Sequence, residues 1–431
     1  MPVNEEAVMR LLKKIMLTVF LSGTFFVVFA REDPFRIARG AQLVEADTYG
    51  RTRWDNPIDR GGAFFITPDP RQGFDDVITY ISLPRLEKRR AAVPLERFFT
   101  DNKEFLVEEA LYSPNTAGKR RKNYWIEDCF FYDTKNGEAG LRVLNYFISK
   151  SMRKKRTFFM HWNLKKNLIT GAYLLFEEDA SPRKGEYDFH SVQVDGMGYN
   201  PAGRTYYYLK IEADIQVRRQ GKYTQYRYAG DQRYTVHAMS EEGDRPVVTF
   251  TAGSRDTRGT YQPDLNFYFM PAYRDPGHEI EKKSPVGYLV DLNHGQTREI
   301  AVQRHTYWSE FDLQRGTLYH VSSSTGTLWA TDLATGRKTA SLKLGDAGDD
   351  RYRKFGFYDD ATLLYYLQGR VLFIDIKNMV VRKTIDLAGR FEEFSASSPV
   401  YILTGGRALL VEARTVHNKT TGYVYYLDSI E

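Results

Sequence analysis

The sequence predicts an all-β fold, a β-propeller made of four-stranded antiparallel blades. A phrase of glycine, an alternating apolar run, an aspartate and a polar turn recurs at residues 286–292, 326–333, 369–376 and 422–428. The aspartates of the first three copies, Asp291, Asp332 and Asp375, are separated by 41 and 43 residues. Short strands that repeat about every 40 residues are typical of propeller blades. Seven blades are favoured, and six or eight stay open.

The composition also favours strands. Aromatic residues make up 14% of the 431-residue chain, and such side chains suit half-buried pleated surfaces. With 42% hydrophobic and 27% charged residues, the chain has enough apolar surface for a packed core. The net charge of +6 is mild and does not require a nucleic-acid partner. The single cysteine, Cys129, rules out an intrachain disulfide and is expected to be a buried thiol.

Residues 1–30 are predicted to be a signal peptide. Basic residues at 10, 13 and 14 precede the apolar run 15–30, which ends in Val28-Phe29-Ala30, and polarity returns at Arg31. The run is shorter than the roughly 20 apolar residues of a spanning helix, so cleavage is favoured over an uncleaved anchor. We therefore expect a protein of the bacterial envelope, periplasmic or extracellular, with no transmembrane span after cleavage.

Residues 31–431 are predicted to form a single propeller domain. Strands are expected at 63–66 and 77–83, a short helix within 95–111, and strands and turns from there to the end. The clearest blade covers 355–387. Residues 31–285 lack the repeated phrase, so an insertion in that half stays open.

The end of the chain predicts how the ring closes. The copy at 422–428 reads as the third strand of a blade, and no fourth strand follows it. We expect the strand at 37–44 to supply the missing outer strand, which would close the ring and remove a sheet edge.

Two segments resemble known repeats. Residues 326–336 are similar to the quinoprotein-like repeat, and residues 371–385 to the YVTN-type β-propeller repeat. The resemblance covers 286–428 and implies the fold without implying a function. Some quinoprotein dehydrogenases of this type use adjacent cysteines beside the quinone, and a chain with one cysteine does not supply them. No cofactor is therefore expected.

Metal sites have little support in the sequence. The 8 histidines have no close ligand spacing, although a His-carboxylate site assembled from different blades stays open. The loop 345–350 is rich in oxygen ligands, and Asp346, Asp349 and Asp350 would bind calcium there, but the full spacing of a calcium loop is missing. No nucleophile elbow or P-loop is present, so the catalytic residues are unknown.

The best candidates for contact residues are basic. We assign two runs, together with the aromatic residues beside the first, to loops between blades and to one binding patch: Lys119, Arg120, Arg121, Lys122, Tyr124, Trp125, Arg153, Lys154, Lys155 and Arg156. Lys88–Arg90 is a third basic run, also assigned to a loop.

The predicted function is an exported, non-enzymatic binding or scaffolding protein that recognises a protein or acidic glycan partner on one propeller face. Nucleic acid is disfavoured because the protein is expected to be exported. The alternative is a hydrolase or lyase with an active site at the mouth of the central channel. Clustered charged side chains at that mouth would favour the enzyme.

Overall fold

The computed structural model describes residues 35–46, 62–68, 76–82, 87–114, 120–148, 153–179, 189–220, 223–255, 259–274, 284–312, 314–322, 324–345, 355–389, 400–402, 408–414 and 420–429. The predicted leader at 1–30, the predicted calcium ligands at 346–350 and Lys119 lie outside these residues. Within them the fold is all-β, with a single α-helix. No helix in this part of the chain is long and apolar enough to cross a membrane.

The described strands form seven antiparallel sheets of three or more strands, numbered here in chain order. The first contains β2 (Gly62–Pro68), β3 (Asp76–Ser82) and β4 (Glu87–Ala92). The second contains β7 (Tyr124–Asp133), β8 (Glu138–Ile148), β9 (Arg153–Asn163) and β10 (Leu168–Asp179). The third contains β11 (Phe189–Asn200), β12 (Thr205–Gln220), β13 (Tyr223–Tyr228), β14 (Gln232–Ser240) and β15 (Gly243–Ala252).

The remaining sheets have shorter strands. The fourth contains β16 (Ser254–Arg255), β17 (Thr260–Gln262), β18 (Phe267–Tyr273), β19 (Pro285–Asp291) and β20 (Gln296–Ile300). The fifth contains β21 (Thr306–Asp312), β22 (Thr317–Ser322), β23 (Thr327–Asp332) and β24 (Lys338–Lys343). The sixth contains β25 (Phe355–Asp359), β26 (Thr362–Leu367), β27 (Arg370–Asp375) and β28 (Val380–Asp386). The seventh contains β29 (Val400–Ile402), β30 (Ala408–Arg414), β31 (Thr420–Ser429) and β1 (Phe35–Ala46).

An insertion separates the first sheet from the second. It contains the helix α2 (Leu95–Asp101), the 3-10 turns η1 (Lys103–Phe105) and η2 (Val107–Glu109), and the two-stranded pair β5 (Tyr112–Pro114) and β6 (Arg120–Lys122). The short helix expected within 95–111 is therefore confirmed at its first half and replaced by 3-10 turns in its second.

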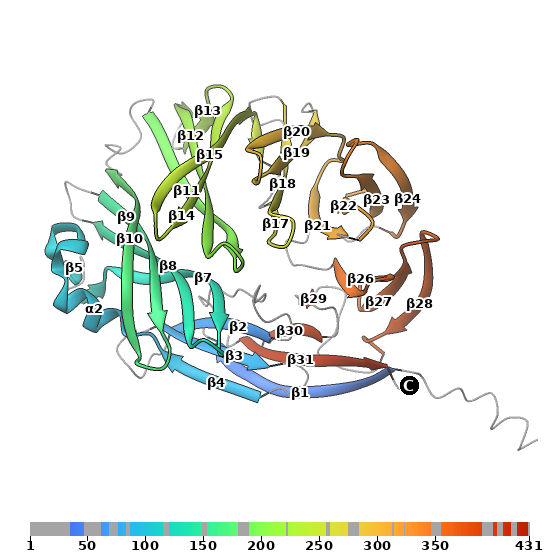
Figure 1. Cartoon of the computed structure of the whole chain (residues 1–431), viewed down its shortest axis with the longest axis horizontal. Helices are drawn as coiled ribbons and strands as arrows, with labels where there is room; N and C mark the ends of the chain where they lie inside the picture. Colours follow the sequence, from blue (N-terminus) through green and yellow to red (C-terminus); the bar gives the residue numbers. More distant parts are fainter. Residues whose placement is uncertain are drawn as a thin grey trace, which may run out of the picture.

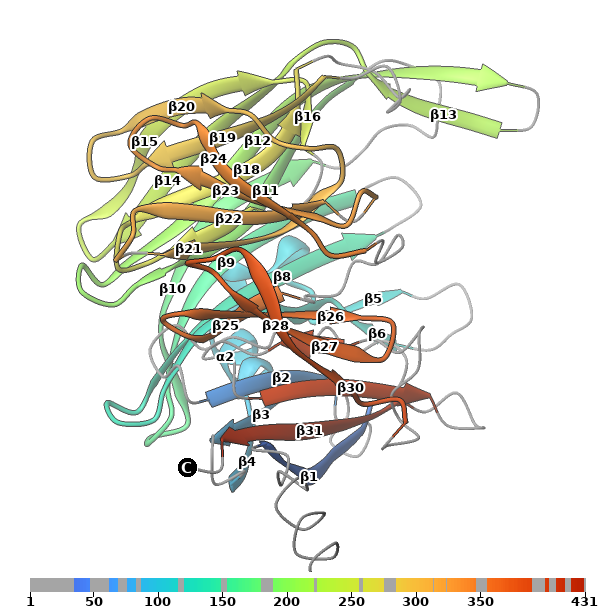
Figure 2. The same ribbon diagram turned by 90° about the vertical axis from the view of Figure 1, so that its right-hand side faces the viewer.

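The sheets follow one another around a common centre (Figure 1). Inner strands of neighbouring sheets touch: β7 contacts β2 and β11, β21 contacts β17 and β25, and β25 contacts β29. Figure 2 shows the same sheets side-on, with the β13 end of the third sheet standing out from the body. A propeller-like arrangement of antiparallel sheets, most of them four-stranded, is thus present.

Hydrophobic side chains fill the spaces between sheets. Among the described residues, six buried clusters each join two successive sheets. Between the second and third sheets, the ring centroids of Phe159 and Tyr206 lie 4.7 Å apart. Between the fifth and sixth, Trp308 packs edge-on against Tyr365 at 6.2 Å. Part of the high aromatic content of the sequence therefore packs one sheet against the next.

The repeated aspartates end strands and hold turns. Asp332 Oδ1 accepts hydrogen bonds from the backbone N–H and the hydroxyl of Thr335, at 2.7 and 2.6 Å. Asp375 Oδ1 accepts from the N–H groups of Lys377 and Asn378, at 2.9 and 3.1 Å. Gly336 follows the first of these turns with φ +70°, a conformation that glycine adopts without strain. These two copies of the recurring phrase therefore each form a strand that ends in an aspartate-capped turn.

The first and last described strands are neighbours. β1 pairs antiparallel with β31 from Phe35 opposite Ser429 to Ala46 opposite Thr420, and forms the outer strand of the seventh sheet. This strand contains the 37–44 segment. Figure 1 shows the first and seventh sheets on the same side of the ring. Closure of the ring by this strand stays a prediction with a direct test.

Deleting residues 31–48, with the leader 1–30 retained, is expected to lower the melting temperature sharply, because β31 would lose its outer partner and expose an edge. Thermal unfolding followed by circular dichroism checks this. The matched control replaces 31–48 with a Gly/Ser segment of equal length, which should melt like the deletion. An unchanged melting curve for either form would overturn closure by β1.

A fully buried histidine lies in the fifth sheet. His320 Nε2 lies 3.2 Å from the Thr331 hydroxyl, and Nδ1 has no hydrogen-bond partner in the described part of the chain. Phe269 and Trp329 pack against the ring. Burial lowers the pKa of His320 to about 3, so the folded protein holds it neutral at mildly acidic pH.

This depressed pKa predicts acid sensitivity. Below the unfolded-state pKa of about 6.5, only the unfolded chain binds the proton, so the free energy of unfolding should fall by up to about 1.4 kcal/mol per pH unit. Urea titrations of the wild type and His320→Gln at pH 7 and pH 5 measure how much the free energy of unfolding of each protein falls between the two pH values. The variant should lose less stability on acidification. Equal acid losses for the wild type and His320→Gln would contradict the assignment.

Candidate binding surface

The basic runs lie in strands, and their assignment to loops is wrong. Arg120–Lys122 forms β6, Arg153–Arg156 begins β9, and Lys88–Arg90 lies within β4. For the β9 run the physical reason is cross-strand compensation: β9 faces the acidic end of β10, with Arg156 opposite Glu177. Opposite charges directly across a strand pair stabilise it, so a basic run can continue a strand. The side chains of Arg120, Arg121 and Arg153 are not among those described.

Two of the predicted patch residues hold the insertion in place. Arg156 Nη1 donates to the carbonyl oxygens of Glu104 and Leu106, at 2.9 and 3.0 Å, while its Nε lies 3.0 Å from Glu177 Oε2. Lys154 Nζ lies 3.7 Å from Glu108 Oε1. These contacts tie the η1 and η2 turns to the start of β9.

Two further patch residues belong to the interior. Tyr124 is 1% exposed and Lys122 is 9% exposed, and the Lys122 ammonium lies 4.5 Å from the centroid of the Tyr124 ring. Tyr124 also packs on Phe99 of α2, with ring centroids 4.6 Å apart. Lys122 and Tyr124 therefore join the insertion to the second sheet through a cation–π contact and a ring contact.

The rest of the patch forms a surface at one end of the second sheet. Trp125 on β7 lies edge-on to Tyr146 on β8, with centroids 6.4 Å apart, and Lys155 on β9 is directly opposite Tyr146. All three side chains are partly exposed. We call Trp125, Tyr146 and Lys155 the aromatic–basic surface. Tyr146 was missed in the sequence because its place beside Trp125 depends on the β7–β8 register.

A separate charged cluster lies where inner strands meet. Arg142 on β8 is almost fully buried, and its Nη2 lies 3.5 Å from Glu127 Oε2 and 3.6 Å from Asp128 Oδ2, both on β7. A bulge between Ile126 and Asp128 places these two consecutive acids against one guanidinium.

The same arginine reaches the next sheet. Arg142 Nη1 donates to the Val194 carbonyl at 2.8 Å and lies 3.8 Å from Asp195 Oδ1 on β11. Asp195 also pairs with Arg255 on β16 of the fourth sheet. Burial opposes the charge of Arg142, but Asp128, Glu127, Tyr206 and Asp195 together raise its pKa. Burial also opposes the charge of Arg255, but Asp195, Tyr268 and Tyr234 together raise its pKa. The cluster therefore links three successive sheets by ion pairs.

Histidine and carboxylate groups occur in pairs. Asp244 accepts a hydrogen bond from the Tyr208 hydroxyl at 2.8 Å, and its Oδ2 lies 3.1 Å from His237 Nδ1. Burial works against the charge of Asp244, yet the bonds from His237 and Tyr208 lower its pKa. Within the described residues, no three His, Cys, Asp or Glu side chains are grouped as metal ligands.

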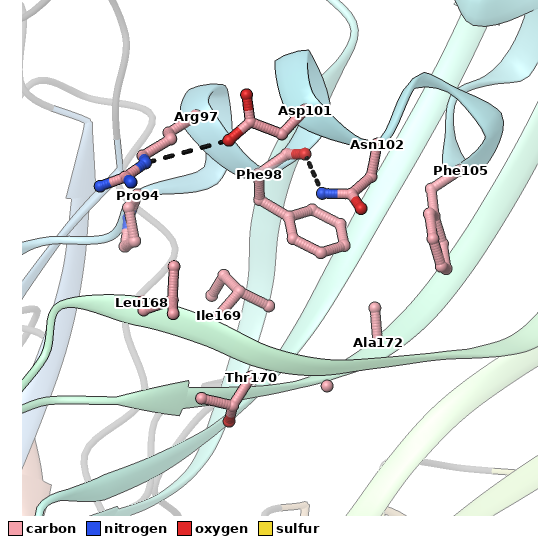
Figure 3. Close-up of a pocket in the computed structure, with 11 residues that line it drawn as sticks. Pro94, Arg97, Phe98, Asp101, Asn102, Phe105, Leu168, Ile169, Thr170 and Ala172 are labelled. Carbon is pink, nitrogen blue, oxygen red and sulfur yellow. Dashed lines mark hydrogen bonds and ion pairs between the residues drawn. The ribbon is translucent and has the colours of Figure 1, made fainter.

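A pocket of about 300 Å³ lies between α2 and β10 (Figure 3). Its apolar lining includes Phe98, Phe105 and Ile169, and Arg97 and Asp101 form an ion pair of 3.9 Å at its rim. Figure 3 shows Leu168 and Ile169 on the α2 side of β10. The helix thus covers part of one face of β10 and leaves a hollow.

No family model matches the chain, and no curated protein matches it. Three solved structures resemble it at low similarity. The first is the AfRom2 CNH domain, with 9% identity and a TM-score of 0.40, covering 91% of this chain and 99% of that one. The second is the dihydro-heme d1 dehydrogenase NirN in complex with DHE, with 10% identity and a TM-score of 0.42, covering 92% of this chain and 76% of that one. The third is a luciferin-regenerating enzyme, with 8% identity and a TM-score of 0.36, covering 91% of this chain and 95% of that one. At these TM-scores the likeness does not extend to a site or a reaction.

The charged cluster should contribute strongly to stability. Arg142→Met removes the guanidinium that the buried Asp128 pairs with, and we expect the free energy of unfolding to fall by about 3–5 kcal/mol. Arg97→Met, which removes the exposed ion pair with Asp101, should change it by less than about 1 kcal/mol. Urea unfolding measures both. Adding Asp128→Asn to Arg142→Met should recover part of the loss; equal losses for the Arg142 and Arg97 variants would count against the cluster.

Proposed function

We propose that this protein is an exported seven-bladed β-propeller of the bacterial envelope that acts as a binding or scaffolding protein and not as an enzyme. Seven sheets around a common centre, with β1 completing the seventh, support the blade number. The leader at 1–30 supports export and rests on the sequence alone. The proposed partner is an acidic glycan bound at the aromatic–basic surface.

The observation that carries the proposal is the convergence of Trp125, Tyr146 and Lys155 from three strands. Each lies on a different strand of one sheet, so the paired backbones bring the three residues together before a partner arrives. Rings of this kind supply large contact area at low entropic cost, and the ammonium attracts acidic groups. Sugar rings that carry carboxylate or sulfate groups combine the apolar faces and the negative charge that such a surface fits.

The charged cluster is the feature that favours the alternative, a hydrolase or lyase at the channel mouth. Asp128, Asp195 and Glu127 lie on inner strands, as a central active site requires. However, they are arranged around Arg142 and Arg255 as ion pairs that connect sheets. This arrangement supports a structural role for the cluster, so binding is the better supported function.

Binding to heparin, with neutral dextran and poly-glutamate as comparison probes, tests the proposal. The full chain, exported and purified from an expressing bacterium, should bind heparin and not dextran. Trp125→Ala and Lys155→Glu should each weaken heparin binding by about tenfold or more, equal to about 1.4 kcal/mol. Isothermal titration at near-physiological salt limits unspecific charge effects.

The matched control is Arg90→Glu, because Arg90 is also an exposed basic residue of a basic run, on β4 of a different sheet. It should leave heparin affinity unchanged. If it lowers affinity as much as Lys155→Glu, the binding is unspecific and the proposed surface is refuted. Binding to poly-glutamate in preference to heparin would replace the glycan with an acidic protein as the partner.

A further inference from the structure

Strand β10 is an outer strand with an unusual composition. It lies at the end of the order β10-β9-β8-β7, and no described strand pairs with its other edge. Residues 168–176 carry no charge. Other outer strands carry basic residues that discourage pairing, among them Lys88 to Arg90 on β4 and Arg382 and Lys383 on β28. A long uncharged edge is a template for another strand.

Exposed apolar side chains mark the same strand. Leu168 is 41% exposed and Leu174 is 48% exposed, although both are large and apolar. The other two exposed large hydrophobic residues of the described chain, Val380 and Val381, lie on β28 beside the charges named above. Helix α2 covers the face of β10 only near Leu168 to Ala172, where the pocket remains (Figure 3). Within the described residues, no strand pairs with the outer edge of β10, and the side chain of Leu174 is exposed.

The charges at the two ends of β10 have opposite sign. Lys165 and Lys166, both exposed, precede the strand, and its last residues are Glu177, Glu178 and Asp179. A second copy of β10 laid antiparallel along this edge brings the basic end of each copy beside the acidic end of the other. A parallel copy would bring like charges together. Glu177 already pairs with Arg156, and its second oxygen can accept a further ammonium.

We infer that two copies of this chain associate edge to edge through antiparallel pairing of their β10 strands. The contact is isologous, as expected of a two-fold dimer. It joins the second sheets of the two copies into one continuous sheet and pairs backbone groups that are otherwise open to solvent. Alternation along β10 places Leu174 on the same face as Ala172, so the Leu174 side chain of each copy can fill the hollow beside α2 of the other.

Sedimentation velocity of the full, exported chain tests the inference. The wild type should sediment as a dimer at micromolar concentration, and Leu174→Lys should raise the dimer dissociation constant by about 100-fold or more, since an ammonium would be buried at the new contact. Val380→Lys is the matched control, because Val380 is 45% exposed on another outer strand. It should leave the dimer intact. A monomeric wild type, or equal effects of the two lysines, would overturn the proposal.

A charge exchange tests the same contact without depending on Leu174. Form A carries Lys165→Glu and Lys166→Glu, and form B carries Glu177→Lys and Glu178→Lys. Each form alone should be mainly monomeric, because its two ends repel those of its own copy. An equal mixture should form A–B dimers, because every end then faces the opposite charge. Circular dichroism confirms that each form is folded. A folded mixture that stays monomeric, or two forms that each dimerise alone, would contradict antiparallel pairing.

Discussion

The structure depends on one constraint: a small antiparallel sheet has two faces and cannot bury either one by itself. Successive sheets of this protein meet that constraint by packing against one another, with aromatic rings in between. Arranging the sheets around a centre lets every member use the same solution. The charged cluster adds ion pairs that connect the second, third and fourth sheets.

The second half of the fold could be predicted from the sequence because its signals are local. Asp332 and Asp375 each cap a turn within three residues, so their spacing in the sequence fixes the spacing of the strands. The first half lacks the repeated phrase, although Asp133 Oδ1 accepts hydrogen bonds from the N–H groups of Lys135 and Asn136 in the same way. Its strands reach 16 residues in β12 and contain bulges, and a bulge such as that at Glu127 changes which residues face each other without changing the composition of the strand.

The same limit explains the partial prediction of the candidate surface. The sequence locates the basic runs, but it does not specify that Arg156 donates to the carbonyls of Glu104 and Leu106, or that Tyr124 packs on Phe99. Those contacts depend on where the insertion folds back onto the second sheet. Tyr146 lies 21 residues from Trp125 in the chain, and only the β7–β8 register brings them together. Long-range pairing of this kind leaves no mark in a single sequence.

The pairing of β1 with β31 has a consequence for how the protein is made. β1 is the first described strand in chain order, and it pairs with β31, the last described strand. β1 therefore has no partner in the seventh sheet until β31 has been synthesised. Contacts between segments this far apart in the sequence form slowly. Until they form, the unpaired edge of the sheet can pair with strands of other molecules.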